Sequence, residues 1–231
     1  MRPLTLLFLA LPALLLAPAA LHADFISTLP NASLSGSPVS ASADFLFSPN
    51  HLTVQIHNQS ADTRSVSQAI RSLQFSLTTP ASSASLSSTS GLERIVASNG
   101  SYTDTPVSNV DWTLSLSNNA FLLNYSAPDH TILGPASPAG FYDNANNSIT
   151  GNKPHNPFLA PDVTFDLTVS GLTSASHLSS ATWGFGTAND TLPAAIANSN
   201  YYPVPEPASL ALLSLGAASL TLFRRPRRHV A

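Results

Sequence analysis

Histidine and aspartate are the side chains in this sequence best suited to bind a metal ion or to act as a general base. The histidines in the central part of the chain are His51, His57, His130, His155 and His177. His51 and His57 lie on the polar face of one alternating run, and strand geometry would place them about 20 Å apart. Asp129–His130 and the pair His155 and Asp162 are further candidates, but no H-x-H or H-x-x-x-H spacing supports a zinc or catalytic site. We therefore expect ordinary surface histidines and no metal-binding residue.

Oxygen ligands are concentrated in residues 143–147, with the sequence Asp-Asn-Ala-Asn-Asn. The run lacks the regular acidic spacing and the distal Glu of a calcium loop, so we predict an Asx-rich turn, although calcium binding is left open. A glycosidase needs two carboxylates about 5–10 Å apart, and Glu93 is the only glutamate of the central region. No G-x-S-x-G motif, and no S-x-x-K with K-T-G, occurs. We predict no catalytic and no cofactor-binding residue, and a protein that is not an enzyme.

The two tryptophans are candidates for stacking on sugar rings, as in carbohydrate-binding modules. Trp112 alternates in phase with Val110 and Leu114, which favours a core position. Trp183 precedes a Gly-Phe-Gly sequence, and its pattern is compatible with either the core or the surface.

The elements that position these residues are strands, because apolar residues alternate with period two and helical periodicity is rare. The clearest runs are His51–His57, Arg71–Leu77, Val110–Leu116 and Val163–Val169. Weaker strands are expected at Ile95–Ser98, Phe121–Asn124, Thr131–Leu133 and Ala181–Gly186. With Asn-, Gly- and Pro-rich turns between them, these runs predict an all-β fold, an antiparallel β-sandwich or jelly-roll-like domain.

Two segments are predicted to lie outside the strands. Residues 81–90 are rich in Ser and Ala, which favours a mobile loop. Residues 193–203 combine Ala, Asn and Pro without periodicity, which is typical of a linker.

Composition excludes several classes of protein. The chain of 231 residues contains no cysteine, which rules out a disulfide scaffold and a thiol nucleophile. Of nine Lys and Arg, only Arg64, Arg71, Arg94 and Lys153 lie between residues 24 and 204, whereas every acidic residue except Glu206 lies there. Such an acidic, Arg-poor body is unsuited to phosphate backbones, so nucleic acid is not an expected partner.

The N-terminus has the organisation of a secretory signal peptide. Arg2 precedes an uncharged, leucine-rich run over residues 4–21, followed by small residues. We predict Ala23 as the exit residue, with Ala17-Pro18-Ala19 as a second candidate exit. The protein is therefore expected to be exported.

The C-terminus combines three elements in a fixed order. Pro205-Glu206-Pro207 is followed by an uncharged run over residues 208–223, and then by the basic residues Arg224, Arg225, Arg227 and Arg228. A helix over 208–223 would be about 24 Å long, which is short for a hydrocarbon core of about 30 Å. The arginines are expected to stop transfer and to remain on the cytoplasmic side. The two prolines keep the tripeptide extended outside the membrane, where the groove of a membrane-embedded enzyme can bind it.

This order of elements resembles the PEP-CTERM sorting signal of Gram-negative bacteria. The resemblance covers about the last 28 residues and implies recognition by an exosortase, a membrane enzyme that cuts at or near the motif. In this family the matching recognition residues are Pro205, Glu206 and Pro207. The family is common in species that make exopolysaccharide and biofilm.

The expected organisation is a signal peptide over 1–23, a β-sandwich ectodomain over 24–192, a linker over 193–203 and a sorting signal over 204–231, with a transmembrane helix at 208–223. The expected function is that of an exported surface or extracellular-matrix protein, held in the inner membrane before processing and then at the cell surface or outside the cell. Its expected partners are the exosortase, the membrane through the C-terminal helix, and an extracellular polysaccharide. The alternative is a carbohydrate-binding or carbohydrate-active surface module.

Overall fold

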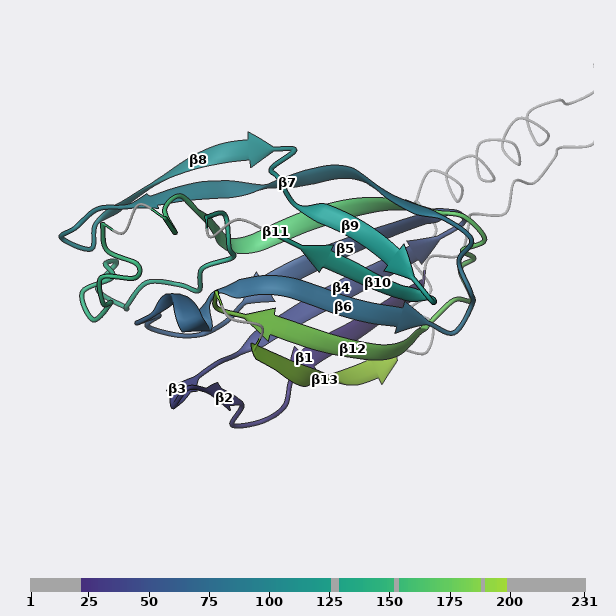
Figure 1. The fold of residues 1–231 in the computed structure, drawn as a ribbon, viewed down its shortest axis with the longest axis horizontal. Coiled ribbons are helices and arrows are strands. Elements are labelled where there is room, and N and C mark those ends of the chain that lie inside the picture. The colour runs from purple at the N-terminus through teal and green to yellow at the C-terminus, as the bar shows by residue number, and fades with distance from the viewer. Residues whose placement is uncertain (1–21, 126–128, 152–153, 188–189, 199–231) are drawn as a thin grey trace, which may run out of the picture. The chain divides into compact units, whose positions relative to one another are not determined.

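The computed structural model describes residues 22–125, 129–151, 154–187 and 190–198 (Figure 1). They belong to one compact unit spanning residues 20–203. This part of the chain is all β apart from a 3₁₀ turn, η1 (Val66–Gln68). Within it we find no helix with the length and apolar character needed to cross a membrane. The strands are β1 (His22–Thr28), β2 (Ser33–Leu34), β3 (Ser37–Pro38), β4 (Ala41–Ser48), β5 (His51–Asn58), β6 (Ile70–Leu77), β7 (Ala84–Val96), β8 (Tyr102–Ser108), β9 (Thr113–Ser117), β10 (Ala120–Asn124), β11 (Phe158–Val169), β12 (Leu178–Phe185) and β13 (Asp190–Asn198).

Hydrogen bonding joins eleven of these strands into one antiparallel sheet. Its order is β8-β7-β11-β5-β4-β1-β13-β12-β6-β10-β9, and β2 and β3 form a separate hairpin. The sheet curls, so that strands far apart in this order face one another across the core (Figure 1). The rings of Phe45 on β4 and Phe75 on β6 are 5.1 Å apart, and those of Trp112 and Phe165 are 4.9 Å apart. The predicted all-β antiparallel class is confirmed, with one curled sheet in place of two separate ones.

Strand β13 connects the two facing halves of the sheet. Residues 190–193 pair with β12, and residues 194–198 pair with β1. The change of partner follows Pro193, which has no N–H to donate to a ladder. Beyond this point the first half of β12 has no β13 neighbour, and the backbone N–H of Leu178 instead donates to Asp24 Oδ2 at 2.7 Å. The carboxylate of Asp24 therefore completes the edge of β12 where β13 leaves it.

The core is built by the alternation that the sequence displays. On β5, Leu52, Val54 and Ile56 are fully buried, as predicted for the run His51–His57. On β6 and β10, Phe75 stacks on Phe121 with ring centres 4.9 Å apart. Burying a side chain of this size contributes about 1.5–3 kcal/mol, so the alternating runs account for both the strands and their packing.

The prediction of a mobile loop at residues 81–90 is wrong, because most of this segment belongs to β7. β7 pairs with β11 along one edge and with β8 along the other. Backbone hydrogen bonds to β11 stabilise its Ser-rich part, which carries few apolar side chains, and β8 pairs with β7 only from Ser90 onward. Short hydroxyl side chains also fit a pleated, half-exposed surface.

Several predicted boundaries differ from the observed ones. β9 begins at Thr113, so Trp112 precedes the strand in which it was expected. His22 and Ala23 lie in β1, opposite Phe47 and Leu46 of β4. β13 extends to Asn198, so the beginning of the expected linker 193–203 is part of the sheet.

Candidate functional site

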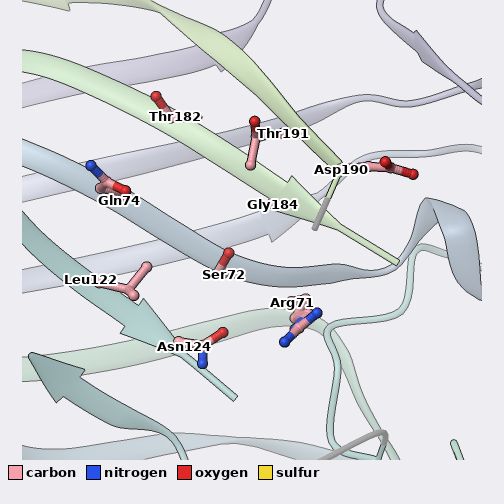
Figure 2. A pocket seen from close by; sticks show the side chains of 9 residues that line it. All are labelled: Arg71, Ser72, Gln74, Leu122, Asn124, Thr182, Gly184, Asp190 and Thr191. Carbon is pink, nitrogen blue, oxygen red and sulfur yellow. The ribbon is translucent and has the colours of Figure 1, made fainter. Parts of the chain in front are cut away.

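A polar groove lies on the outer face of the curled sheet, across β10, β6, β12 and β13 (Figure 2). Gly184 forms part of its floor, where an added Cβ would collide with Ser72 Oγ. The missing side chain at this position therefore keeps the groove open. Polar residues that line the groove are Arg71, Ser72, Gln74, Asn124, Thr182, Asp190 and Thr191.

The groove combines one cation, one carboxylate, amides and hydroxyls. Arg71 is held at one end by a hydrogen bond from Nη1 to the Thr187 carbonyl at 3.0 Å. Such donors and acceptors suit a hydroxyl-rich ligand.

The tryptophans do not form a sugar-stacking platform. Trp112 is buried, as its alternation predicted, and its Nε1 donates to the His130 carbonyl at 3.1 Å. Trp183 has no exposed surface and packs near Phe185. The surface position left open for Trp183 is therefore excluded.

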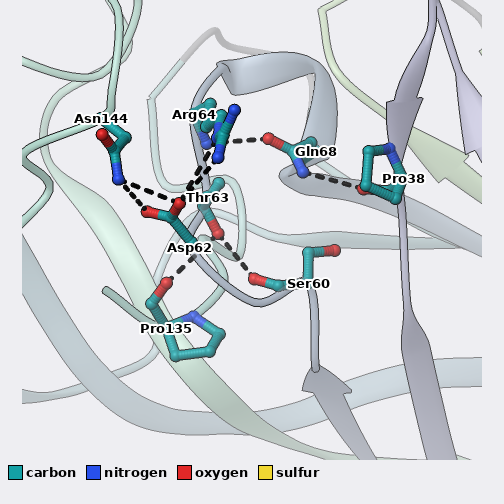
Figure 3. Close-up of polar contacts among 8 residues, drawn as sticks. All are labelled: Pro38, Ser60, Asp62, Thr63, Arg64, Gln68, Pro135 and Asn144. Atoms are coloured by element: carbon teal, nitrogen blue, oxygen red, sulfur yellow. Dashed lines mark hydrogen bonds and ion pairs between the residues drawn. The ribbon is translucent and has the colours of Figure 1, made fainter. Parts of the chain in front are cut away.

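The Asx-rich segment is connected to the loop that contains Asp62 (Figure 3). The amide of Asn144 donates to both carboxylate oxygens of Asp62, at 3.0 and 3.2 Å, and Arg64 Nη2 lies 3.2 Å from the same group. Asn146 Oδ1 accepts from the Ser148 N–H at 2.8 Å, which is the predicted Asx turn. These hydrogen bonds give the polar side chains of the segment a structural role, which is to link it to the loop that contains Asp62.

The side-chain amide of Gln68 holds the base of the same loop through hydrogen bonds of both its oxygen and its nitrogen. Its Oε1 accepts from the Arg64 N–H, and its Nε2 donates to the Pro38 carbonyl, both at 2.8 Å (Figure 3). Nearby, Thr63 Oγ1 donates to the Ser60 carbonyl at 2.9 Å, and the Pro135 carbonyl accepts from the Thr63 N–H at 3.4 Å. The loop is thus tied to β3 and to the segment after β10.

His51 and His57 lie on the outer face of β5, as predicted, and each faces acids of neighbouring strands. His57 Nδ1 is 2.7 Å from Asp162 Oδ1, and its Nε2 is 3.4 Å from Asp44 Oδ2. His51 Nε2 is 3.6 Å from Asp166 Oδ1. Because the two histidines have separate acidic neighbours, they do not form a common site.

His130 lies near two acids, of which Asp129 is its neighbour in sequence and Glu93 is distant in sequence. Its Nε2 lies 3.0 Å from Glu93 Oε2, and its Nδ1 lies 3.7 Å from Asp129 Oδ2. Burial raises the pKa of the neighbouring Tyr125 to about 12, with a further contribution from Asp129. The site therefore has a half-buried His–carboxylate pair next to a phenol that stays neutral at ordinary pH.

Arg94 forms a second buried polar group. It makes a bidentate pair with Asp104, with both N–O distances 2.7 Å, and lies 3.9 Å from the centre of the Tyr102 ring. Burial alone lowers the pKa of Arg94, but its hydrogen bond to Asp104 helps raise that pKa overall. Tyr142 donates to the Gly134 carbonyl, and burial raises the pKa of Tyr142 to about 12, against the opposing charge of Arg94. This group stabilises the fold at the end of the sheet where β7 and β8 meet.

His22, Asp24 and His177 form a cluster that sequence reasoning missed. Asp24 Oδ1 lies 2.8 Å from His22 Nε2 and 3.3 Å from His177 Nδ1. His22 and Asp24 are buried, whereas the His177 side chain is 37% exposed. The H-x-D pattern was visible in the sequence, but the predicted leader included His22, and His177 lies far along the chain.

The predicted sorting residues Pro205, Glu206 and Pro207 lie outside the described residues, as do the four C-terminal arginines and the predicted helix 208–223. Comparison with family models identifies a PEP-CTERM protein-sorting motif at residues 203–228. The resemblance derived from the sequence is therefore confirmed, and the motif supports exosortase-dependent sorting of an exported protein. No curated protein and no solved structure matches the chain.

Proposed function

We propose that this protein is a surface or extracellular-matrix protein associated with exopolysaccharide, which an exosortase detaches from its C-terminal tail. The observation that carries the proposal is the PEP-CTERM motif at residues 203–228. In this proposal a signal peptide directs export, and a short helix holds the chain in the inner membrane until it is cut. The all-β body is a sandwich-like, non-catalytic module.

The sequence chemistry of the tail supports this order of events. Pro205 and Pro207 disfavour helix on either side of Glu206, which leaves an extended segment with one carboxylate for a membrane-embedded enzyme to bind. The basic residues after position 223 oppose passage of the tail through the membrane.

The test is the intact mass of the protein produced in a host with an exosortase and in the same host without it. Replacing Pro205, Glu206 and Pro207 together by alanine should leave the full tail attached and keep the protein in the membrane fraction. The Ser199→Ala variant, which changes a residue outside the matched motif, should be processed like the wild type. Secreted protein that still carries the terminal arginines would refute the proposal.

The polar groove supports a second candidate function, the binding of a polysaccharide. Its amides and hydroxyls (Figure 2) match a ligand rich in hydroxyl groups. In affinity gel electrophoresis, the double variant Gln74→Ala with Asn124→Ala should lose retention on the exopolysaccharide of the producing strain. Gln55→Ala, on the outer face of β5, is the matched control and should be retained. Equal retention of the groove variant and the control would exclude the groove as the binding site.

A further inference from the structure

We propose that His22, Asp24 and His177 form a binding site for one zinc ion. The three side chains each offer one ligand atom, and these atoms all lie within 4.8 Å of one another. Two imidazoles and one carboxylate are a common zinc ligand set. Hard cations such as Ca²⁺ prefer oxygen ligands, so the two nitrogen ligands select against calcium.

The observed distances are close to those of a metal site. Zinc is bound at about 2.0–2.2 Å by nitrogen and oxygen ligands, so neighbouring ligand atoms of a tetrahedral site lie about 3.3 Å apart. The Asp24–His177 distance is 3.3 Å, and the Asp24–His22 distance is 2.8 Å. A small outward movement of one ring therefore makes room for the ion.

Surrounding contacts hold the ligands in place before any metal binds. The second oxygen of Asp24 accepts from the Leu178 N–H, which fixes the carboxylate and points Oδ1 at both imidazoles. The His22 ring stacks on Phe47, with ring centres 5.7 Å apart. The backbone of His177 bonds to Thr78 in both directions, with His177 N–H donating to Thr78 Oγ1 and Thr78 N–H donating to the His177 carbonyl. Of these contacts, the hydrogen bond to the Asp24 carboxylate is of the kind that is typical around metal ligands.

The position of the site suits an ion that links two strands. His22 and Asp24 come from β1, and His177 lies directly before β12, so the ion would link two strands that β13 bridges only in part. The exposed edge of His177 leaves the fourth ligand position to water or to an outside group.

The proposed site also has a consequence for where the signal peptide is cut. A cut after Ala23 would remove His22, whereas a cut at the alternative exit Ala17-Pro18-Ala19 would leave it in the mature chain. The zinc site therefore requires that the leader be removed before residue 22.

The experiment uses the secreted mature protein, stripped of metal with a chelator and titrated with zinc chloride by isothermal calorimetry. We expect one zinc ion per chain and no heat of binding with calcium chloride. His177→Gln, at a partly exposed position, and Asp24→Asn, which keeps an acceptor for Leu178, should bind zinc at least about tenfold more weakly. His51→Gln is the control and should bind like the wild type.

Three results would overturn the proposal. The first is a wild-type protein that takes up no zinc. The second is a His177→Gln variant that binds zinc as tightly as the wild type while its circular dichroism is unchanged. The third is a mature N-terminus at Asp24, established by mass spectrometry of the secreted protein. If Asp24→Asn does not fold, His177→Gln alone decides the matter.

Discussion

Replacement of Trp183 by alanine distinguishes a core residue from a sugar-binding one. The Trp183 side chain is fully buried within the curled sheet, and deletion of a buried Trp costs about 3–5 kcal/mol. For a domain of this size each kcal/mol changes the Tm by about 2–4 °C. We therefore expect Trp183→Ala to lower the Tm by about 6–20 °C, a large part of a total stability of about 5–15 kcal/mol.

Trp183→Phe is the matched variant, because the indole nitrogen of Trp183 has no hydrogen-bond partner among the described residues. Leaving such a donor buried costs about 1–3 kcal/mol. Phenylalanine removes the donor and leaves a small gap, so the two effects offset one another and the stability should change by less than about 1 kcal/mol.

The assay is thermal unfolding and urea unfolding, each followed by circular dichroism, together with affinity electrophoresis of the folded protein on polysaccharide. The structural reasoning predicts a large loss of stability for Trp183→Ala and a small change for Trp183→Phe. A Trp183→Ala variant of wild-type stability that has lost polysaccharide retention would refute it, because that result requires an exposed ring.

Three further predictions concern stability. Asp104→Ala leaves Arg94 buried without its carboxylate, so the urea midpoint should fall by an amount equivalent to about 2–4 kcal/mol; an unchanged midpoint would contradict the role of this pair. The pKa of Tyr142 is raised to about 12 in the fold and is about 10 in an unfolded chain, so its contribution to stability is complete below pH 10 and is lost as the pH rises to 12. Alkaline denaturation of Tyr142→Phe, compared with the wild type, measures this contribution, and identical profiles would argue against it. Asn118 has φ +50° in the β9–β10 turn, so Asn118→Ala should cost about 1 kcal/mol in thermal unfolding, whereas Asn118→Gly should not.

The strands that sequence reasoning found are those with strong apolar alternation. The runs in β5, β6 and β11 place every second side chain in the core, and a local pattern is sufficient to detect this. The first part of β7 was missed because its stability comes from hydrogen bonds to β11 and not from apolar alternation, whereas the end of β7 overlaps the weak strand expected at Ile95–Ser98. β4 was missed although Ala41, Ala43, Phe45 and Phe47 alternate and are all fully buried, so its signal was present in the sequence.

The candidate sites show the same division between local and distant information. The sorting motif is contiguous, so the sequence was sufficient to identify it. The zinc cluster joins His22 and Asp24 to His177 across almost the whole length of the body, and no spacing rule connects residues that far apart. The groove depends equally on the fold, since Arg71, Asn124 and Asp190 come from different strands.

The pairing of β1 with β13 has a consequence for the timing of folding. A chain is synthesised from its N-terminus, so β1 emerges early, but its partner along one edge, residues 194–198, is nearly the last part of the body to follow. Until then β1 has one neighbour, β4, and the two halves of the sheet are not yet joined. The body can complete its fold only after residues 194–198 have been synthesised, and these lie just before the motif at 203–228. The sheet is therefore completed only shortly before the sorting signal is synthesised.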